Sequence, residues 1–100
     1  MSKITVDGIL FEWDDEKARI NFNKHGVTFK TAAKVFGDEY RIDEFDFLHS
    51  GVEERRRVIG KVGKILFVIY TEREPTKRII SARQATAKEK ERYYAHKGSN

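Results

Sequence analysis

Apolar and polar residues alternate with different periods along the chain, and the first part predicts a strand followed by a helix. Residues 9–13 are mostly apolar and follow a turn signal at Asp7 and Gly8, so we expect a strand there with a small hairpin arm before it. Asp14 or Asp15 can cap the next helix, and Gly26 can end it. The buried stripe expected for this helix consists of Ala18 and Phe22, with Ile20 as a further member.

The central part of the chain predicts a second helix and then a series of strands. The helix should begin at Thr28 and end at Gly37. Its core-facing stripe, at helical spacing, consists of Phe29, Ala32, Ala33 and Phe36. Strands are expected at residues 40–47, 55–59, 65–70 and 77–83, with a tight turn at 60–63. Segment 65–70 is almost wholly apolar, which predicts a central strand buried on both faces.

The last predicted element is a C-terminal helix. Thr86 and Glu89 match a capping box, so this helix should run from about residue 87 to residue 96, with Tyr93 or Tyr94 facing the sheet. Helices that precede a run of strands favour an α+β fold. We therefore expect a single domain over residues 1–100, with its core at about 9–96. A small antiparallel sheet of four to five strands should carry two N-terminal helices and one C-terminal helix.

Composition and charge narrow the function classes. The 100 residues are 39% apolar and 36% charged, with a net charge of +4, a balance that suits nucleic acid or an acidic protein partner. The lack of cysteine excludes disulfides, thiolate metal sites and cysteine catalysis. Because His25, His49 and His96 lack metal-ligand spacing, we expect no metal and no cofactor. No segment resembles a signal peptide or a membrane span, so we expect a cytoplasmic protein without membrane contact.

Two arginines near the ends of the apolar segment 78–83 are the main candidates for contact with an anion. A guanidinium group presents a planar fork of donors that suits phosphate. Arg83 lies close to the predicted helix start at Thr86, where free amides and the helix dipole also attract anions, so we favour a phosphate site there. An ion pair between Arg83 and Glu89 is the structural alternative. Strand alternation places Arg78 and Arg83 on opposite faces of the sheet.

Two further candidate groups have both a structural and a functional interpretation. Lys24 and His25 lie at a predicted helix end, where the dipole favours cations and where a histidine can also exchange protons. Tyr70 and Arg73 come at the end of the most apolar strand. They can either reach a surface site or follow the strand as it leaves the core.

The arginine run at residues 55–57 is a third candidate. Alternation sends Arg55 and Arg57 to one face of the strand and Arg56 to the other. The paired guanidinium groups can track RNA phosphates, or they can protect a solvated edge strand from aggregation.

An ordered set of residues resembles a known family, the BrnT-type toxins, over roughly residues 9–94. These toxins belong to bacterial type II toxin–antitoxin pairs and are similar to RelE-like ribonucleases, small α+β domains that cleave RNA and slow translation. The arm before Phe11 is longer than the family usually begins. The residues that carry the resemblance are Phe11 to Asp14, Lys17, Asn21, Lys24 to Val27, Phe29, Ala32, Glu54, Arg55, Thr71 to Arg73, Arg78 to Arg83 and Arg92 to Tyr94.

The resemblance implies transfer of an RNA phosphate to its own 2′-hydroxyl and inhibition of translation. Because the sequence has no acidic cluster spaced to hold a metal, we expect cleavage to be metal-independent. It also implies a ribbon-helix-helix antitoxin as partner, a heterotetramer, and contact with operator DNA only through the antitoxin. The expected roles are phosphate stabilisation by Arg83 and Arg73 with help from Arg55, proton transfer by His25 with Lys24 or Tyr70 in reserve, and RNA contact by Arg55, Arg57 and Arg78.

Two alternatives remain open. Catalysis can lack a strong base and depend mainly on arginine electrostatics. The chain can also be a non-catalytic module, for example a co-repressor subunit, whose basic charge binds nucleic acid or an acidic protein and whose acidic segment 38–46 meets a basic partner.

Overall fold

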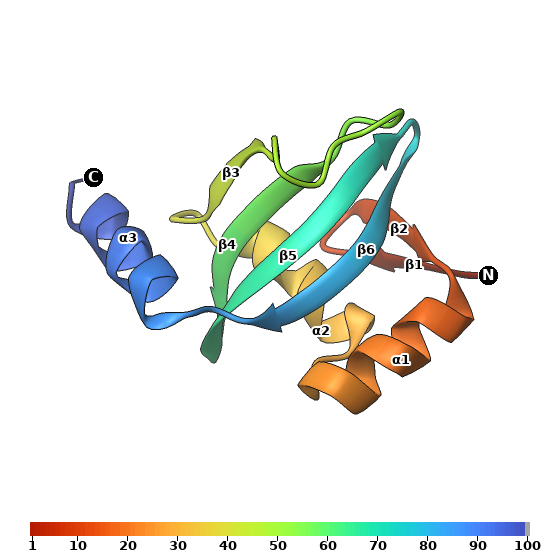
Figure 1. The fold of residues 1–100 in the computed structure, drawn as a ribbon, viewed down its shortest axis with the longest axis horizontal. Helices are drawn as coiled ribbons and strands as arrows, with labels where there is room; N and C mark the ends of the chain where they lie inside the picture. The colour runs from red at the N-terminus through yellow and green to blue at the C-terminus, as the bar shows by residue number, and fades with distance from the viewer. Residues whose placement is uncertain (100) are drawn as a thin grey trace.

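The protein is built on one six-stranded sheet, as the computed structural model, which describes residues 1–99, shows (Figure 1). The spatial order is β1-β2-β6-β5-β4-β3, and all neighbours are antiparallel except β2 and β6, which are parallel. The α+β class is confirmed, but the expected four to five antiparallel strands are not. The strands are β1 Ser2–Val6, β2 Ile9–Trp13, β3 Ile42–Phe45, β4 Arg56–Val62, β5 Lys64–Arg73 and β6 Thr76–Gln84.

The extra strand is the N-terminal arm, which forms a complete hairpin with β2. Asp7 and Gly8 both have positive φ, at 51° and 80°, and join Val6 to its partner Ile9. A two-residue turn with positive φ at both positions matches the right-handed twist of the strands that it connects. The arm therefore extends the sheet beyond β2 instead of remaining a short appendage.

The helices divide between the two sides of the sheet (Figure 1). One face of the sheet, which we call the covered face, packs against α1 (Asp15–His25), α2 (Phe29–Ala33) and the 3₁₀ helix η1 (Lys34–Gly37). Helix α3 (Ala87–Gly98) packs against β4 on the other side. The expected caps at Asp14, Thr28 and Thr86 are confirmed, and the second helix is shorter than expected because its last turn is 3₁₀. Within residues 1–99, no helix is long and apolar enough to cross a membrane.

The main core lies between the covered face and α2. The expected stripe of the second helix is buried, and it meets side chains from β2, β4, β5 and β6. Gly60 lies inside β4, where a Cβ would come within 2.9 Å of the Val35 Cβ, so glycine allows η1 to approach the strand. The expected turn at 60–63 was therefore placed too early; the chain reverses at Gly63, whose φ is 71°.

The buried residue of α1 is Asn21, not Phe22 or Ile20, which are about half exposed. The Asn21 side chain accepts a hydrogen bond from the Ala82 N–H at 3.1 Å and donates one to the Ala82 carbonyl at 2.8 Å. A side-chain amide thus pairs with the backbone of β6 as a neighbouring strand would. The expected stripe is right for Ala18, which packs against the main core, and wrong for Phe22 and Ile20. The reason is that α1 lies against a strand edge with unpaired backbone groups, which need a polar partner.

A β-bulge in β6 changes which side chains share a face. Ile69 pairs with Ser81 but Tyr70 pairs with Ile79, so Ile80 is an extra residue on β6. The extra residue reverses the alternation, and Arg78 and Arg83 therefore lie on the same face, as their partners Thr71 and Phe67 do. Their expected placement on opposite faces was wrong for this reason.

Candidate active site

The face of the sheet opposite α1 and α2, which we call the open face, carries most of the charged candidates. The strand register aligns its side chains in rows that run across the strands. The first row contains Arg83, Phe67 and Ile59; the second contains Ser81, Ile69, Arg57 and Glu44; the third contains Glu12, Arg78 and Thr71. Three arginines, one from β4 and two from β6, are thus gathered on one surface.

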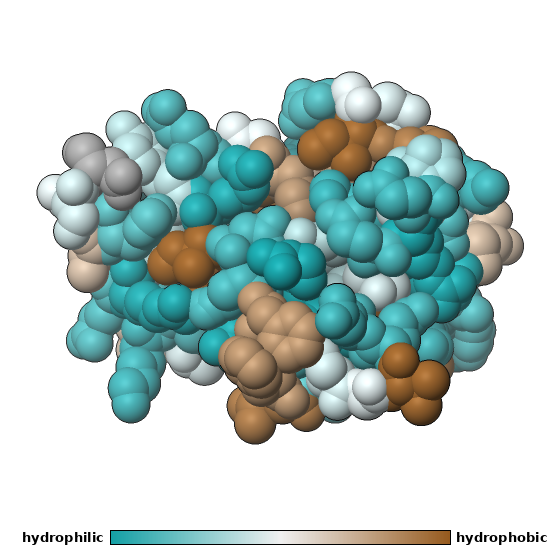
Figure 2. Space-filling view, turned by 90° about the horizontal axis from the view of Figure 1, so that it is seen from above, coloured by the Kyte–Doolittle hydropathy of each residue, from teal (hydrophilic) through white to brown (hydrophobic). Residues whose placement is uncertain are grey.

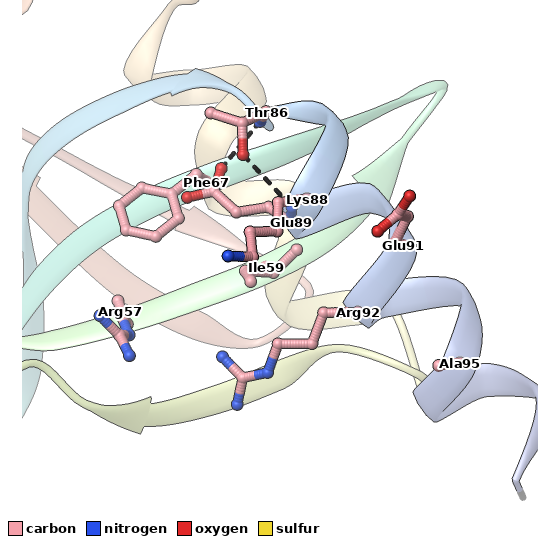
Figure 3. Close-up of a pocket in the computed structure, with 9 residues that line it drawn as sticks. All are labelled: Arg57, Ile59, Phe67, Thr86, Lys88, Glu89, Glu91, Arg92 and Ala95. Atoms are coloured by element: carbon pink, nitrogen blue, oxygen red, sulfur yellow. Dashed lines mark hydrogen bonds between the residues drawn. The ribbon is translucent and has the colours of Figure 1, made fainter.

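A cavity of about 580 Å³ lies where α3 meets this face (Figure 3). Its floor is formed by Ile59 and Phe67, and Arg57 borders it on the sheet. Thr86 and Arg92 line it from α3, and Figure 3 shows the guanidinium groups of Arg57 and Arg92 over the strands. An apolar floor with a few convergent charged groups is the usual form of a binding site.

Arg83 is fixed between the sheet and the start of α3. Its guanidinium lies 4.1 Å from the centre of the Phe67 ring and donates two hydrogen bonds to Glu89, at 2.8 and 3.0 Å. Glu89 also accepts a hydrogen bond from the Thr86 N–H, which completes the capping box. Burial alone would raise the pKa of Glu89, but the bonds from Arg83 and Thr86 outweigh it and lower the pKa. The expected position beside a helix start and the alternative ion pair are therefore both present.

Arg57 and Arg92 share the carboxylate of Glu44. Arg57 Nη2 donates to Glu44 at 3.4 Å, and Arg92 forms an ion pair with the same group. The Arg92 hydrogen bond is the main reason that the pKa of Glu44 is lowered. The Nε of Arg57 is buried without a hydrogen-bond partner among the described residues, so this guanidinium keeps an unused donor.

A histidine and a buried aspartate complete this end of the site. Asp46 is fully buried just after β3, and its Oδ2 lies 2.6 Å from Nδ1 of His49. Its other oxygen lies 3.8 Å from Nη1 of Arg57. Neither residue was predicted as part of the site, since His49 was considered only as a possible metal ligand. The available signal was the Asp-x-x-His spacing followed by Ser50, directly before the arginine-rich strand.

Two other predicted arginines on this side of the sheet are held by acids away from the cavity. Arg78 donates to Glu12 at 2.9 Å and is mostly buried by this pair. Arg73 pairs with Glu53 near the tip of the β5–β6 hairpin, at 2.9 Å. Arg73 lies six residues along β5 from Phe67, the partner of Arg83, which is about 20 Å at the usual rise of a strand. The structure therefore does not bring Arg73 and Arg83 to one phosphate.

Arg55 lies just before β4, and among residues 1–99 its side chain has no ion-pair partner. Its backbone carbonyl accepts a hydrogen bond from the Asp46 N–H at 2.9 Å, which places it next to the His49 turn. Arg55 is thus a partly exposed cation at the edge of the open face.

Lys24 and His25 border a separate, smaller cavity of about 230 Å³ at the edge of β6. Lys17 from α1 and Ile80 and Ser81 from β6 line the same cavity. Since Ser81 belongs to the second row of the open face, the cations of α1 approach that face from the side opposite α3.

Tyr70 lies on the covered face, where it is almost fully buried. Its hydroxyl donates to the carboxylate of Asp43, with oxygens at 2.7 and 2.9 Å, and Arg56 binds the same group. Burial, reinforced by the negative Asp43, raises the pKa of Tyr70 well above its ordinary value. The structure thus separates Tyr70 and Arg56 from the other candidates by the thickness of the sheet.

The open face is suited to bind a polyanion. Arg57 and Arg92 line one cavity, and Arg83 binds Glu89, which lines the same cavity. Each of these arginines is held in place by a carboxylate that an incoming phosphate can replace as hydrogen-bond acceptor. A family model described as a ribonuclease toxin, BrnT, of type II toxin–antitoxin systems matches residues 13–89. A comparison with curated proteins found no match. The matched segment begins at the end of β2, so the β1 arm lies outside it.

Proposed function

Because the chain belongs to the BrnT family of ribonuclease toxins of type II toxin–antitoxin systems, we propose that it is a metal-independent endoribonuclease with its active site on the open face. The observation that carries this assignment is the position of Arg57 and Arg83. The register places both on one face, two strands apart; Arg57 lines the cavity, and Arg83 binds Glu89, which also lines it. Because β4 and β6 pair with the two edges of β5, two permanent positive charges lie on a single surface.

The reaction that we assign is attack of an RNA 2′-hydroxyl on the adjacent phosphate. The negative charge that develops on the phosphorane is stabilised by Arg83 and Arg57, with Arg92 at the rim. Glu44 and Glu89 hold these guanidinium groups in position until phosphate oxygens replace the carboxylates. The proposal of cleavage without metal is supported by the chemistry of Glu44 and Glu89, since arginine already neutralises both carboxylates.

We assign RNA contacts away from the scissile phosphate to Arg55, Arg78 and Arg73, and to Lys24 and His25 on α1. These groups lie around the open face, and together they extend its positive charge beyond the cavity. Non-specific binding to RNA phosphates depends on such distributed charge. We leave Tyr70 out of the site because it is buried on the covered face.

We further propose the RelE-like fold, inhibition of translation by RNA cleavage in the cytoplasm, and neutralisation by a ribbon-helix-helix antitoxin in a heterotetramer that reaches operator DNA through the antitoxin. The family supports a toxin with an antitoxin partner and an RNA substrate. The finer points rest on the resemblance of the motifs between residues 9 and 94.

The test is RNA cleavage by purified protein in EDTA, with and without ribosomes. We expect cleavage by the wild type, a loss of 100-fold or more for Arg83→Ala, and an unchanged rate for Arg19→Ala. Arg19 is a matched control because it is an exposed arginine of α1 whose ion-pair partner among residues 1–99 is Glu16, one turn away. Intact RNA under both conditions would contradict the proposal and favour the non-catalytic binding module.

A further inference from the structure

His49 and Asp46 form a pair with the geometry of an oriented imidazole. A carboxylate only accepts hydrogen bonds, so His49 Nδ1 carries the proton of the 2.6 Å contact with Asp46. Neutral His49 then has its lone pair on Nε2, the nitrogen that faces away from the carboxylate. The ring is about half exposed while Asp46 is fully buried, so the fixed partner lies inside and the reactive nitrogen can reach solvent.

The turn that carries His49 is held at its base by a set of hydrogen bonds. The Asp46 N–H donates to the Arg55 carbonyl at 2.9 Å, and Ser50 Oγ donates to the Asp46 carbonyl at 2.7 Å. The Arg55 N–H in turn donates to Ser50 Oγ at 2.9 Å, and the Leu48 N–H donates to Asp46 Oδ1 at 3.2 Å. These bonds close the segment between β3 and β4, so His49 is fixed relative to β4.

The pair is joined to the active site through Arg57. The two oxygens of Asp46 face His49 and Arg57 respectively, so the imidazole and the guanidinium flank one carboxylate. Arg57 also borders the main cavity and binds Glu44 in the second row of the open face. His25 lies at the β6 edge and His96 in the last turn of α3, whereas His49 contacts the carboxylate that also faces this arginine.

We propose that His49 is the general base of RNA cleavage and that Asp46 is its positioning residue; this inference rests on the function proposed above. Nε2 of His49 takes the proton of the 2′-hydroxyl while the 2′-oxygen forms its bond to phosphorus. The bond between phosphorus and the 5′-oxygen breaks, and the leaving oxygen takes a proton from water. The products are a 2′,3′-cyclic phosphate and a 5′-hydroxyl. Asp46 keeps the reactive tautomer and stabilises the imidazolium that forms.

The surroundings of His49 suit contact with a large substrate. Phe47, Leu48 and Val52 of the same loop are strongly exposed, and Figure 2 shows scattered apolar patches on a mostly hydrophilic surface. Aromatic and apolar groups beside a positive surface bind unstacked bases of single-stranded RNA. The base and its phosphate-binding arginine are thus accessible to a strand lying on the open face.

The experiment compares His49→Gln with His25→Gln and His96→Gln under the condition, with or without ribosomes, in which the wild type cuts RNA. We expect a rate loss of roughly 100-fold to 10,000-fold for His49→Gln and less than about twofold for His96→Gln. Thermal unfolding should show that His49→Gln keeps the wild-type fold, because this ring is half exposed. Asp46→Asn should also lose cleavage tenfold or more, because an amide no longer selects the reactive tautomer.

A second substrate distinguishes a general base from a general acid as the role of His49. In an RNA of the same sequence, sulfur replaces the leaving 5′-oxygen at the cleaved bond, and a thiolate leaves without protonation. His49→Gln should remain defective on this substrate, because its 2′-hydroxyl still needs a base. Restored cleavage would overturn the assignment of His49 as the base.

The remaining outcomes distinguish this inference from the proposed function. Full activity of His49→Gln, or loss of activity in His25→Gln alone, would overturn the role of His49 while the wild type remained a ribonuclease. A wild-type protein that cuts no RNA would overturn both.

Discussion

Two neighbouring arginines of β4, Arg56 and Arg57, lie on opposite faces of the sheet and have different surroundings. Arg56 points to the covered face, where it joins Asp43 and the buried hydroxyl of Tyr70. Arg57 points to the open face, where it borders the cavity and contacts Glu44. A single step along β4 therefore separates a structural ion pair from a candidate catalytic group.

The number of ion pairs that an arginine forms does not distinguish a structural role from a catalytic one. On the covered face, the partly exposed pair of Arg56 and Asp43 is tied to Tyr70, whose ring is buried in the aromatic and aliphatic core, where loss of a side chain leaves a cavity. On the open face, the ion pairs remain partly exposed and a phosphate can enter as a new partner. We therefore expect substitutions on the covered face to change stability and substitutions on the open face to change activity.

The largest expected effect is on the covered face, in Phe36→Ala. Phe36 is buried between Phe11, at 5.3 Å between ring centres, and Tyr70, at 4.9 Å. Loss of a buried aromatic side chain costs about 3–5 kcal/mol. Urea unfolding should show a fall of this size in the free energy of unfolding. Phe47→Ala is the matched control, because Phe47 is strongly exposed and should leave the unfolding midpoint nearly unchanged. Equal effects of the two substitutions would contradict the described core.

The second prediction uses the matched pair Arg57→Ala and Arg56→Ala. Arg57→Ala should lower RNA cleavage by about 100-fold, because a donor near the reacting phosphate is lost. Its unfolding free energy should fall by about 1 kcal/mol or less, since Glu44 retains Arg92. Arg56→Ala should leave cleavage within a few-fold of the wild type and should lower stability, because Asp43 loses its cation. Single-turnover cleavage and urea unfolding measure the two effects, and a reversed order would place the active site on the covered face.

Much of the fold could be predicted because its signals are local. The caps at Asp14, Thr28 and Thr86 and the turn at Asp7 and Gly8 depend on residues within a few positions, and all are confirmed. The parallel pairing of β2 with β6 could not be predicted. More than sixty residues separate the two strands, and no local sequence pattern in either strand indicates the other as its partner. The strand edge that this leaves on β6 is also what makes Asn21, instead of an apolar residue, the buried side chain of α1.

The candidate site could be predicted only in part, for the same reason. The position of Arg83 beside a helix start follows from local sequence, and so does its pair with Glu89. The face on which Arg78 lies depends on the bulge at Ile80, which strand alternation cannot show. Likewise, the contact of Asp46 with Arg57 joins two strands, so the importance of the nearby His49 becomes visible only once β3 and β4 are paired.

The smallest expected effect is the acid sensitivity of the open face, tested with Glu89→Gln. Bonds from Arg83 and Thr86 outweigh burial and lower the pKa of Glu89 from its ordinary value of 4.5, so the folded protein binds this proton less readily than the unfolded chain does. The resulting stabilisation is fully present above about pH 4.5 and is lost as the pH falls through the lowered pKa. Glu89→Gln lacks this titration, so its unfolding midpoint should fall less steeply below pH 4.5 than that of the wild type, by an amount worth less than about 1 kcal/mol. Glu91→Gln is the control, because Glu91 is an exposed acid of the same helix and should keep the wild-type slope. If Glu89→Gln also keeps that slope, Arg83 is not held by Glu89 in solution, and its guanidinium is free for phosphate without first releasing a carboxylate.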